Sequence, residues 1–527
     1  MKADQMNVNT HHHPATIEVG SRKLTIEDVL MVAKNRCSVT LSAAPAFTQR
    51  IQQGADFIEK LLANNGTVYG LNTGYGDSCT TTIPAHLVDE LPLHLTRFHG
   101  CGMGEYLDDE ATLAVLICRL NSLTQGYSGV RPELLKQLVA LINNQILPLI
   151  PEEGSVGASG DLTPLSYVAA ALIGEREVRH HGTQRTAAEA LAMIGISPIK
   201  LAPKEGLAIM NGTAVMTALA CLAWERAEYL TRLCSRLTAL ASIALRGNRG
   251  HFDPILFAAK PHFGQNESAA WIFSDLHEDA QEMIRIQDRY SIRCAPHVIG
   301  VTRDALTWMR RDIENELNSA NDNPLFDVEG ERVLHGGHFY GGHIAFAMDA
   351  LKTAVANLAD LMDRQLAQLV DPKFNQGLPH NLSGSTGERA AINHGFKAVQ
   401  IGSSAWAAEA LKLTMPASVF SRSTECHNQD KVSMGTIAAR DCLRILTLTE
   451  QVAAALTLAT VQGIALRQRV DANTNQRPVA ITPPVNEFLA TIRSHSPFLD
   501  EDRPLEQELR HIATLIRQGH WRLYHHA

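Results

Sequence analysis

A set of unusually long segments with helical periodicity is the sequence feature that most constrains the fold. In residues 343–371, apolar residues recur at steps of three and four, and polar residues occupy much of the opposite face. Residues 206–246 and 434–470 form longer segments of the same kind, well beyond an average globular helix. A long helix needs packing partners along its whole length, so the sequence predicts a helical bundle that is shared between subunits.

Shorter helical segments and very few strands complete this prediction. Helical spacing also marks residues 108–124, 131–146, 300–318 and 390–413. Strand signals are confined to Thr16–Val19, Val68–Gly70 and Val178–His180. We therefore expect a mainly α fold with a flexible tail over residues 1–20, a smaller globular region over residues 21–205, and a long-helix bundle over residues 206–527.

Composition excludes several classes of function. The net charge of -8 is spread without a block of like charge, which argues against nucleic-acid and membrane-surface partners. The nine cysteines form no Cys-x-x-Cys pair, which favours a reducing compartment. The first twenty residues have no apolar core of a signal peptide, and no uninterrupted apolar stretch reaches membrane-spanning length. We expect a cytoplasmic protein, without a metal site at His11, His12 and His13.

Residues 154–175 place a turn of small residues directly before an apolar helix. In this turn the Gly160 nitrogen can reach the Ala158 carbonyl carbon and close a five-membered ring. Loss of water, including the Ser159 hydroxyl, then leaves an exocyclic methylidene, which is a strong electrophile. Gly160 suits the attack because it has no side chain to block the approach. By itself, the triplet is equally compatible with an ordinary helix-entry turn.

Further segments that accompany this triplet carry a family resemblance. They are VYGLNTGYG (68–76), EGLAIMNGT (205–213), QDRYSIRC (287–294), NSANDNPLF (318–326), HGGHFYGG (335–342) and HNQDKVSMG (427–435). In this order, the sequence resembles the histidine/phenylalanine/tyrosine ammonia-lyase family along almost its whole length. The resemblance implies 4-methylidene-imidazol-5-one (MIO) formed autocatalytically from Ala158, Ser159 and Gly160, no metal, and a homotetramer with composite active sites.

The resemblance also implies catalytic roles, in a reaction that removes ammonia across the Cα–Cβ bond of an amino acid. Tyr69 would take the β-proton, which requires a lowered pKa from nearby positive charge or donors. Arg293 would clamp the substrate carboxylate, and Asn211 would hold the MIO group or the substrate's polar end. The structural alternatives are a tyrosine that packs a glycine-rich turn, a surface ion pair and a helix cap.

Other residues are implied to complete the pocket. Tyr290 and Gln287 would form a polar wall, with Tyr290 assisting proton transfer, and Glu409 would pair with a partner such as the substrate amine. The remaining candidates for substrate binding are Phe98, His99, Phe339, Asn428 and Gln429. A polar helix face and a core aromatic are the structural alternatives for Gln287, Tyr290 and Phe339.

Two positions bear on the substrate. Gln429 stands where histidine-specific members carry a glutamate, which argues against histidine. Phe98 and His99 occupy the family's selectivity pair, and His99 could hydrogen-bond a phenolic hydroxyl. We therefore expect tyrosine first, then phenylalanine, then histidine; a core histidine bonded to backbone is the alternative for His99.

Some positions depart from the family pattern and leave alternatives open. His297 stands where glutamine is usual, His338 and Tyr340 replace the asparagine and histidine of Gly-Gly-Asn-Phe-His, and Lys431 is unusual in its motif. Glu425, Cys426 and His427 lack a fourth ligand at sensible spacing, so we expect no metal there. An aminomutase shares all these residues, and an inactive scaffold homologue is the alternative from another class.

Overall fold

The computed structural model describes residues 15–63, 67–278 and 285–524, so the three N-terminal histidines lie outside the described residues. The chain forms two compact units, each assembled from separated segments. Unit 1 comprises Met1–Cys221, Ile313–Ile344 and Phe420–Ile437, and unit 2 comprises Leu222–Asp312, Ala345–Val419 and Ala438–Ala527. This division differs from the single boundary expected at residues 205 and 206, because the chain passes repeatedly from one unit to the other.

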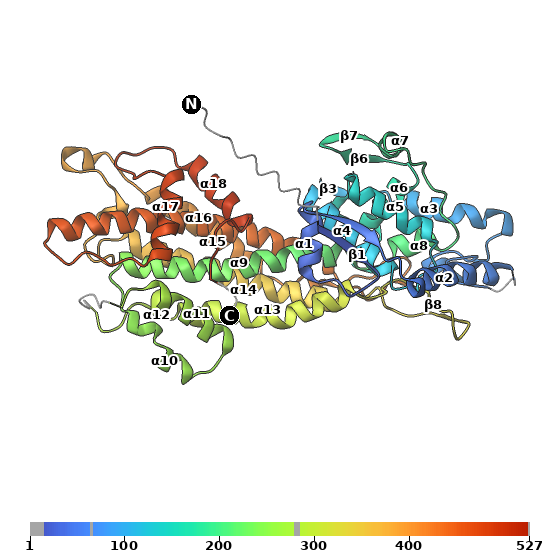
Figure 1. Cartoon of the computed structure of the whole chain (residues 1–527), viewed down its shortest axis with the longest axis horizontal. Coiled ribbons are helices and arrows are strands. Elements are labelled where there is room, and N and C mark those ends of the chain that lie inside the picture. Colours follow the sequence, from blue (N-terminus) through green and yellow to red (C-terminus); the bar gives the residue numbers. More distant parts are fainter. Residues whose placement is uncertain (1–14, 64–66, 279–284, 525–527) are drawn as a thin grey trace, which may run out of the picture. The chain divides into compact units, whose positions relative to one another are not determined.

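Four of these five passages are each made by one long helix, and the fifth lies in the short 3-10 helix Ala417–Phe420. The four helices are α9 (Ala214–Ala244), α13 (Ala295–Leu317), α14 (Gly342–Val370) and α16 (Gly435–Asn473) (Figure 1). They confirm the prediction of long helices, with one difference. The predicted helix over residues 206–246 is divided into α8 (Glu205–Met210) and α9, because the polar Asn-Gly-Thr sequence at 211–213 interrupts it.

Shorter helices fill both units. In unit 1 the described residues form α1 (Ile26–Ala33), α2 (Pro45–Ala63), α3 (Leu91–Phe98), α4 (Asp109–Leu123), α5 (Pro132–Asn143), α6 (Thr163–Leu172) and α7 (Ala187–Met193). In unit 2 they form α10 (Pro254–Ala258), α11 (Phe263–Asp275), α12 (Tyr290–Arg293), α15 (Lys397–Lys412), α17 (Pro483–His495) and α18 (Glu506–Arg517). Helices α4, α5 and α15 confirm three of the shorter predicted segments.

Strands are short and belong to unit 1. β1 (Ala15–Val19) pairs in parallel with β2 (Cys37–Leu41), so part of the expected tail is a strand. The antiparallel pairs are β3 (Met103–Tyr106) with β5 (Pro151–Glu153), β4 (Ile146–Pro148) with β6 (Glu177–His180), β6 with β7 (Thr183–Thr186), and β8 (Leu325–Asp327) with β9 (Arg332–Leu334). The strand predicted at Val68–Gly70 is wrong: this segment is a turn, in which Gly70 has a φ of +75°.

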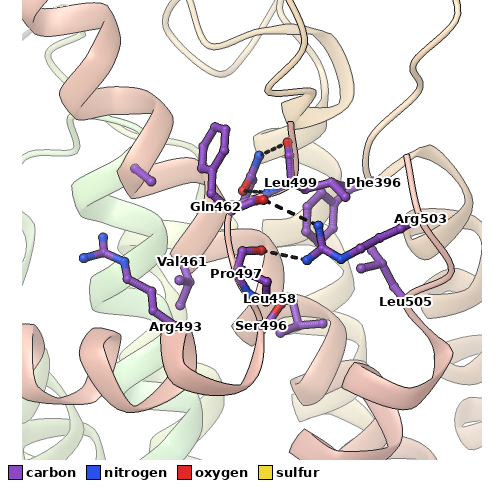
Figure 2. Close-up of a pocket in the computed structure, with 12 residues that line it drawn as sticks. Phe396, Leu458, Val461, Gln462, Arg493, Ser496, Pro497, Leu499, Arg503 and Leu505 are labelled. Carbon is purple, nitrogen blue, oxygen red and sulfur yellow. Dashed lines mark hydrogen bonds between the residues drawn. The ribbon is translucent and has the colours of Figure 1, made fainter. Parts of the chain in front are cut away.

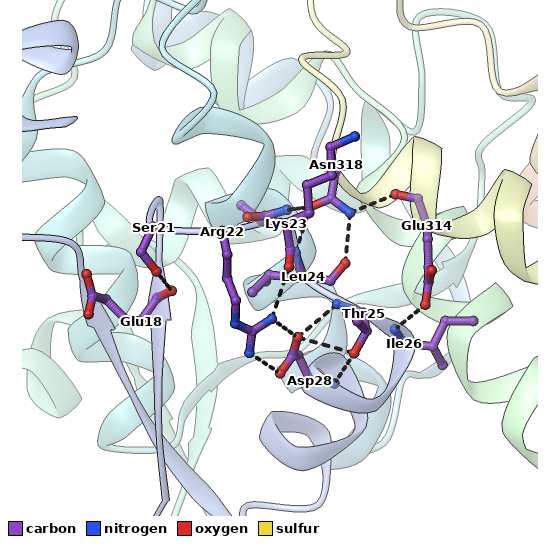
Figure 3. Close-up of polar contacts among 11 residues, drawn as sticks. Glu18, Ser21, Arg22, Lys23, Leu24, Thr25, Ile26, Asp28, Glu314 and Asn318 are labelled. Atoms are coloured by element: carbon purple, nitrogen blue, oxygen red, sulfur yellow. Dashed lines mark hydrogen bonds and ion pairs between the residues drawn. The ribbon is translucent and has the colours of Figure 1, made fainter. Parts of the chain in front are cut away.

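A hydrogen-bond network joins the start of α1 to the end of α13 (Figure 3). Thr25 caps α1 and forms a reciprocal capping box with Asp28, whose carboxylate also pairs with Arg22. The Asn318 side chain accepts from the Leu24 N–H and donates to the Leu24 carbonyl, both at 2.8 Å. These bonds attach the N-terminal segment to the hairpin-bearing segment of unit 1 that follows α13.

Unit 2 is a bundle built on α9, α14 and α16, closed by the C-terminal helices. The Arg467 guanidinium on α16 is buried and donates to the Ala244 carbonyl at the end of α9 at 2.9 Å. Gln462 donates to the Leu499 carbonyl and accepts from the Leu499 N–H, which fixes the segment before α18 (Figure 2). The same amide also donates to the Leu382 carbonyl. A cavity of about 250 Å³ lies beside this amide.

Helix α16 is long and apolar enough to cross a membrane by length and composition alone. However, 78% of its apolar 18-residue stretch is buried inside the protein, as expected for a core helix of a bundle. Its apolar surface is therefore already used in helix packing.

One small apolar cluster of unit 1 positions residues that matter below. Phe326 of β8 packs with Phe57, Ile58, Val68 and Leu71, and it meets the ring of Phe57 edge-on at 6.1 Å. Val68 begins the turn that was predicted as a strand, and Leu71 directly follows the predicted segment. The cluster therefore ties that turn to the β8–β9 hairpin.

Replacing Phe326 by alanine should lower the free energy of unfolding by about 3–5 kcal/mol, because the buried ring leaves a cavity between the turn and the hairpin. Urea denaturation followed by fluorescence and circular dichroism would measure this. Leu334→Ala on the neighbouring strand is the matched control, since this side chain is 45% exposed, and should cost less than about 1 kcal/mol. Equal losses for both variants would contradict the assigned cluster.

Candidate active site

Unit 1 contains a cavity of about 1000 Å³ at which most of the predicted site residues meet. Ten of the fourteen line it: Tyr69, Phe98, His99, Ala158, Ser159, Gly160, Asn211, Phe339, Asn428 and Gln429. They come from the turn after α2, the end of α3, the segment before α6, the break between α8 and α9, the loop after β9 and the segment before α16. These residues are far apart in the sequence, and the fold of unit 1 brings them to one cavity.

The turn at Ala158, Ser159 and Gly160 is held in a conformation that only glycine can complete. Gly160 has a φ of +70°, and a Cβ at this position would lie 2.0 Å from the Gly212 carbonyl oxygen. The Asn211 side-chain amide donates to the Ser159 carbonyl at 2.7 Å. The loop between α8 and α9 therefore forms one wall of the turn.

A buried carboxylate anchors the end of this turn. Asp161 accepts from the Val215 N–H at 2.7 Å and the Met216 N–H at 3.3 Å, in the first turn of α9, and from the Thr436 hydroxyl. Burial raises the pKa of Asp161 to about 6, although these three donors and the guanidinium of Arg119 oppose the rise. The carboxylate occupies the place where helix N–H groups lack intrahelical partners.

Arg119 reinforces the same region from the interior. It is fully buried on α4, and it donates to the Asn211 carbonyl at 3.3 Å and to the Ser122 hydroxyl at 2.9 Å. Burial lowers the pKa of Arg119, while the carboxylates of Asp322 and Asp161 raise it. Sequence reasoning missed both Arg119 and Asp161. Arg119 lies inside an apolar helical segment, where a charged residue gives no distinct spacing signal, and nothing in the local sequence marks the loop residue Asp161 as buried.

Asn211 keeps one atom unsatisfied. Its Nδ2 donates a hydrogen bond to the Ser159 carbonyl, but its Oδ1 is buried and has no hydrogen-bond partner among the described residues. Such an orphaned acceptor at a cavity is costly unless a ligand or water serves it. Asn211 also follows α8 as its C-terminal cap residue, which is the structural alternative that the sequence offered for it.

Tyr69 differs from the sequence expectation in its electrostatics. Its hydroxyl accepts from the Gly76 N–H at 2.8 Å, and this donor lowers its pKa. Burial is the largest influence and raises the pKa of Tyr69, and the charges of Glu425 and Cys79 raise it further. The expectation of a pKa lowered by positive charge or donors is therefore met only by the Gly76 donor, and among the described residues burial and negative charges outweigh it.

His99 follows α3 as its C-terminal cap residue and lines the cavity. Its Nδ1 bonds the Leu95 carbonyl at 3.1 Å, and its ring lies 4.3 Å from that of Phe98. Burial lowers the pKa of His99, with the Glu425 carboxylate acting in the opposite direction. A neutral ring that donates through Nδ1 offers Nε2 as an acceptor to whatever fills the cavity.

The loop before α16 supplies amides and a carboxylate. The Gln429 carbonyl oxygen accepts from the Thr424 hydroxyl at 2.8 Å, which directs its amino group to Ser159 Oγ at 3.4 Å. Glu425 lines the cavity, where it accepts from the Asp77 N–H and from Asn428 Nδ2, both at 3.2 Å. Sequence reasoning considered Glu425 only as a metal ligand, and the structure instead places it between the Tyr69 turn and this loop.

The four remaining predicted residues belong to unit 2. Arg293 donates to the Asp288 carbonyl at 2.9 Å and to Gln287 Oε1 at 3.2 Å, and it lies 4.7 Å from the ring centroid of Tyr290. Tyr290 is 72% exposed. Glu409 of α15, whose side chain is 44% exposed, pairs with Arg444 at 2.6 Å, so this carboxylate has a partner within unit 2.

The departures from the family pattern form contacts of their own. Lys431 lines the cavity of unit 1, and its ammonium lies 5.8 Å from the ring centroid of Tyr340, a cation–π pair. In unit 2, His297 Nδ1 bonds Gln265 Oε1 at 2.6 Å and its ring stacks on Phe257 at 5.4 Å. Two of the positions that differ from the family pattern, Lys431 and Tyr340, thus contact each other.

Comparison with known proteins gives consistent results. Residues 24–494 match the family described as aromatic amino acid lyase. A histidine ammonia-lyase of Gloeobacter violaceus is 36% identical over 94% of this chain and 95% of its own length. The structure of a tyrosine aminomutase from Streptomyces globisporus has a TM-score of 0.88 at 33% identity, covering 96% of this chain and 97% of that one. A histidine ammonia-lyase from Trypanosoma cruzi has a TM-score of 0.86 at 32% identity, covering 96% and 94%.

A pH dependence follows from Asp161. Because burial raises the pKa of Asp161 to about 6 from its ordinary value of 3.8, the folded state binds more protons than the unfolded state between these values. The wild type should therefore lose stability relative to Asp161→Asn as pH rises from about 4 to 7, by at most about 3 kcal/mol at about 1.4 kcal/mol per pKa unit. Urea unfolding across this range would measure the difference.

The control is Asp500→Asn, which changes an exposed carboxylate outside this site and should show a flat difference over the same range. A flat difference for Asp161→Asn as well would contradict a raised pKa in the folded protein.

Proposed function

The chain belongs to the aromatic amino acid lyase family, whose members are carbon–nitrogen lyases, and we propose that it eliminates ammonia from an aromatic L-amino acid to give an α,β-unsaturated aryl acid. The observation that carries this proposal is the turn at Ala158, Ser159 and Gly160, which lies in one cavity with Tyr69 and Asn211.

The turn fits an MIO group. Gly160 has no room for a side chain, Ala158 is buried, and the Asn211 amide already polarises the Ser159 carbonyl between the two ring-closing residues. Once formed, the group would supply an electrophile that makes the substrate nitrogen a better leaving group. The orphaned Asn211 Oδ1 is available as an acceptor beside it.

Tyr69 is the proposed base for the β-proton. The Gly76 N–H stabilises the phenolate that this role requires, and the raised pKa makes the phenolate a strong base once it forms. Glu425, whose carboxylate lines the same cavity, is the proposed acceptor for the substrate amine. This assigns to Glu425 the function that we expected of Glu409.

Tyrosine is the substrate that we propose first. His99 Nε2 is an acceptor for the phenolic hydroxyl, and the adjacent Phe98 ring gives the aromatic substrate a flat partner. Gln429 carries no charge where an imidazolium would gain from one, and its amino group is directed at Ser159. Phenylalanine would fit the same wall but would leave His99 Nε2 unpaired.

Histidine is the second candidate, because several relatives are named histidine ammonia-lyases. An imidazole N–H can also donate to His99 Nε2, and Glu425 offers a nearby carboxylate. An aminomutase is a further alternative, which similarity to a tyrosine aminomutase favours. Product analysis separates it, since an aminomutase returns the amine to the β-carbon.

A homotetramer with composite sites is the assembly that we propose, in the cytoplasm. Large apolar side chains are exposed on three helices of unit 2: Val301 on α13 at 63%, Phe346 on α14 at 64% and Ile401 on α15 at 62%. Apolar exposure of this kind is typical of surfaces that pack against another subunit. Another copy would bring its Arg293, Tyr290 and Gln287 to the cavity of unit 1.

Purified protein should form a conjugated acid, which is followed by the rise in ultraviolet absorbance. The rate should be highest with L-tyrosine, lower with L-phenylalanine and lowest with L-histidine. His99→Phe should reverse the order of tyrosine and phenylalanine, with a loss for tyrosine of about tenfold to a hundredfold in kcat/KM, because the phenolic hydroxyl loses its acceptor. Initial rates with each amino acid give these ratios.

Ser159→Ala is the control that removes the electrophile, and it should abolish turnover. The wild-type peptide that contains Ser159 should be lighter than its sequence by two water molecules, as measured by mass spectrometry. Turnover of histidine alone would overturn the tyrosine assignment, and an unmodified peptide would overturn the MIO proposal.

Composite sites predict complementation between inactive chains. Arg293→Ala should lower kcat/KM by about a hundredfold or more, because loss of one partner in a buried charge pair costs on the order of 3 kcal/mol. When Ser159→Ala and Arg293→Ala chains are dissociated and reassembled together in equal amounts, about one site in four should unite both intact residues. Activity measured after reassembly tests this.

The matched control combines Arg293→Ala chains with chains that carry both substitutions, a mixture in which no intact Arg293 exists. It should stay inactive. If the first mixture also stays inactive, each site is built within one chain and the composite proposal is wrong.

A further inference from the structure

A proton taken up by Tyr69 needs a route out of the cavity. The Tyr69 hydroxyl accepts from the Gly76 N–H, but its own hydrogen has no acceptor among the residues that the structure describes. The side chain is partly buried, and burial favours the protonated phenol by raising its pKa. Turnover would therefore stop after one cycle unless another group accepts this proton.

His335 is the group whose position suits this task. Its ring meets that of Tyr69 edge-on, with centroids 6.3 Å apart and planes at 70°. Both side chains line the same cavity, yet His335 is exposed to solvent. Imidazole is the side chain that ordinarily gains and loses protons near neutral pH, and a single water can bridge two polar atoms that do not touch.

The fold builds this pair. Val68, directly before Tyr69, and Phe326 of β8 belong to the apolar cluster described above, and Val333 of β9 packs against it two residues before His335. The turn after His335 is fixed by the Gly336 N–H, which donates to Asn323 Oδ1 at 2.8 Å. Apolar packing of both segments thus keeps the two rings in this edge-on arrangement.

The other groups near Tyr69 are less suited to carry the proton. The Glu425 carboxylate is engaged by the Asp77 N–H and Asn428 Nδ2 and is the proposed partner of the substrate amine. The Tyr75 hydroxyl is buried and has no hydrogen-bond partner among the described residues, and burial raises its pKa. The charge of Cys79 raises the pKa of Tyr69. The His99 ring is already hydrogen-bonded to the Leu95 carbonyl.

We propose that His335 is a positioning residue that carries the proton from Tyr69 to solvent between turnovers. The Tyr69 phenolate first takes the β-proton, so that a C–H bond breaks and an O–H bond forms. That proton then passes, directly or through one water, to a ring nitrogen of His335, and from the imidazolium to a solvent base. Tyr69 returns to the phenolate form. This inference rests on the proposed function of Tyr69 as the base.

The test is chemical rescue of His335→Gln in the full-length protein. At low buffer concentration, kcat should fall by about tenfold or more while KM changes less than twofold, because proton release becomes limiting after substrate binding. Added imidazole should restore kcat in proportion to its concentration, since His335 is exposed and a small base can occupy its place. The wild type should respond weakly to imidazole.

His94→Gln is the matched control, because His94 is an exposed histidine on α3 that pairs with Glu90 and does not line the cavity. It should keep wild-type turnover and show no response to imidazole. The mass of the Ser159 peptide and the circular dichroism spectrum of each variant confirm that the turn and fold are intact.

Each outcome is decisive. A loss in His335→Gln that imidazole does not restore, or no loss at all, would overturn the relay while leaving the proposed function in place. Absence of turnover by the wild type with every aromatic amino acid would instead overturn the proposed function, and the relay with it.

Discussion

The buried carboxylate of Asp161 is the interaction on which the rest of the site depends. It accepts from two backbone N–H groups at the start of α9 and from Thr436 at the start of α16, and it directly follows Gly160. The small-residue turn is thereby fixed by the beginnings of two long helices. A helix N-terminus stabilises negative charge, which partly offsets the cost of burying this carboxylate. The long helices therefore set the position of the turn as well as forming the core.

The charges of the cavity follow from which segments unit 1 contains. Its described lining includes a phenol, an imidazole, amides and the Glu425 carboxylate, and its ammonium group, Lys431, faces the ring of Tyr340. A substrate carboxylate needs a bidentate cation, and Arg293 is the proposed one. Arg293 belongs to unit 2, so the proposed mechanism takes its base and its amine-binding groups from the cavity of unit 1 and its carboxylate clamp from a segment of unit 2.

Substrate selection rests on few side chains within a shared fold. This chain is about equally similar to proteins named for histidine and for tyrosine, with 36% and 33% identity. Backbone similarity at this level does not distinguish a phenol from an imidazole. In the function proposed above, the distinction lies with the Nε2 acceptor of His99 and the neutral amide of Gln429, because a buried donor or acceptor without a partner is costly.

The sequence by itself determined the long helices, the order of the motifs and the family, because periodicity and local residue patterns are properties of neighbouring positions. It also identified ten residues that line one cavity. It did not predict the break at 211–213, the turn at 68–70, the raised pKa of Tyr69, or the roles of Asp161, Arg119 and Glu425. Those depend on desolvation and on contacts between segments hundreds of residues apart, such as Asp161 with Thr436. Only the tertiary structure decides which groups leave water together, and burial then sets their hydrogen bonds and pKa values.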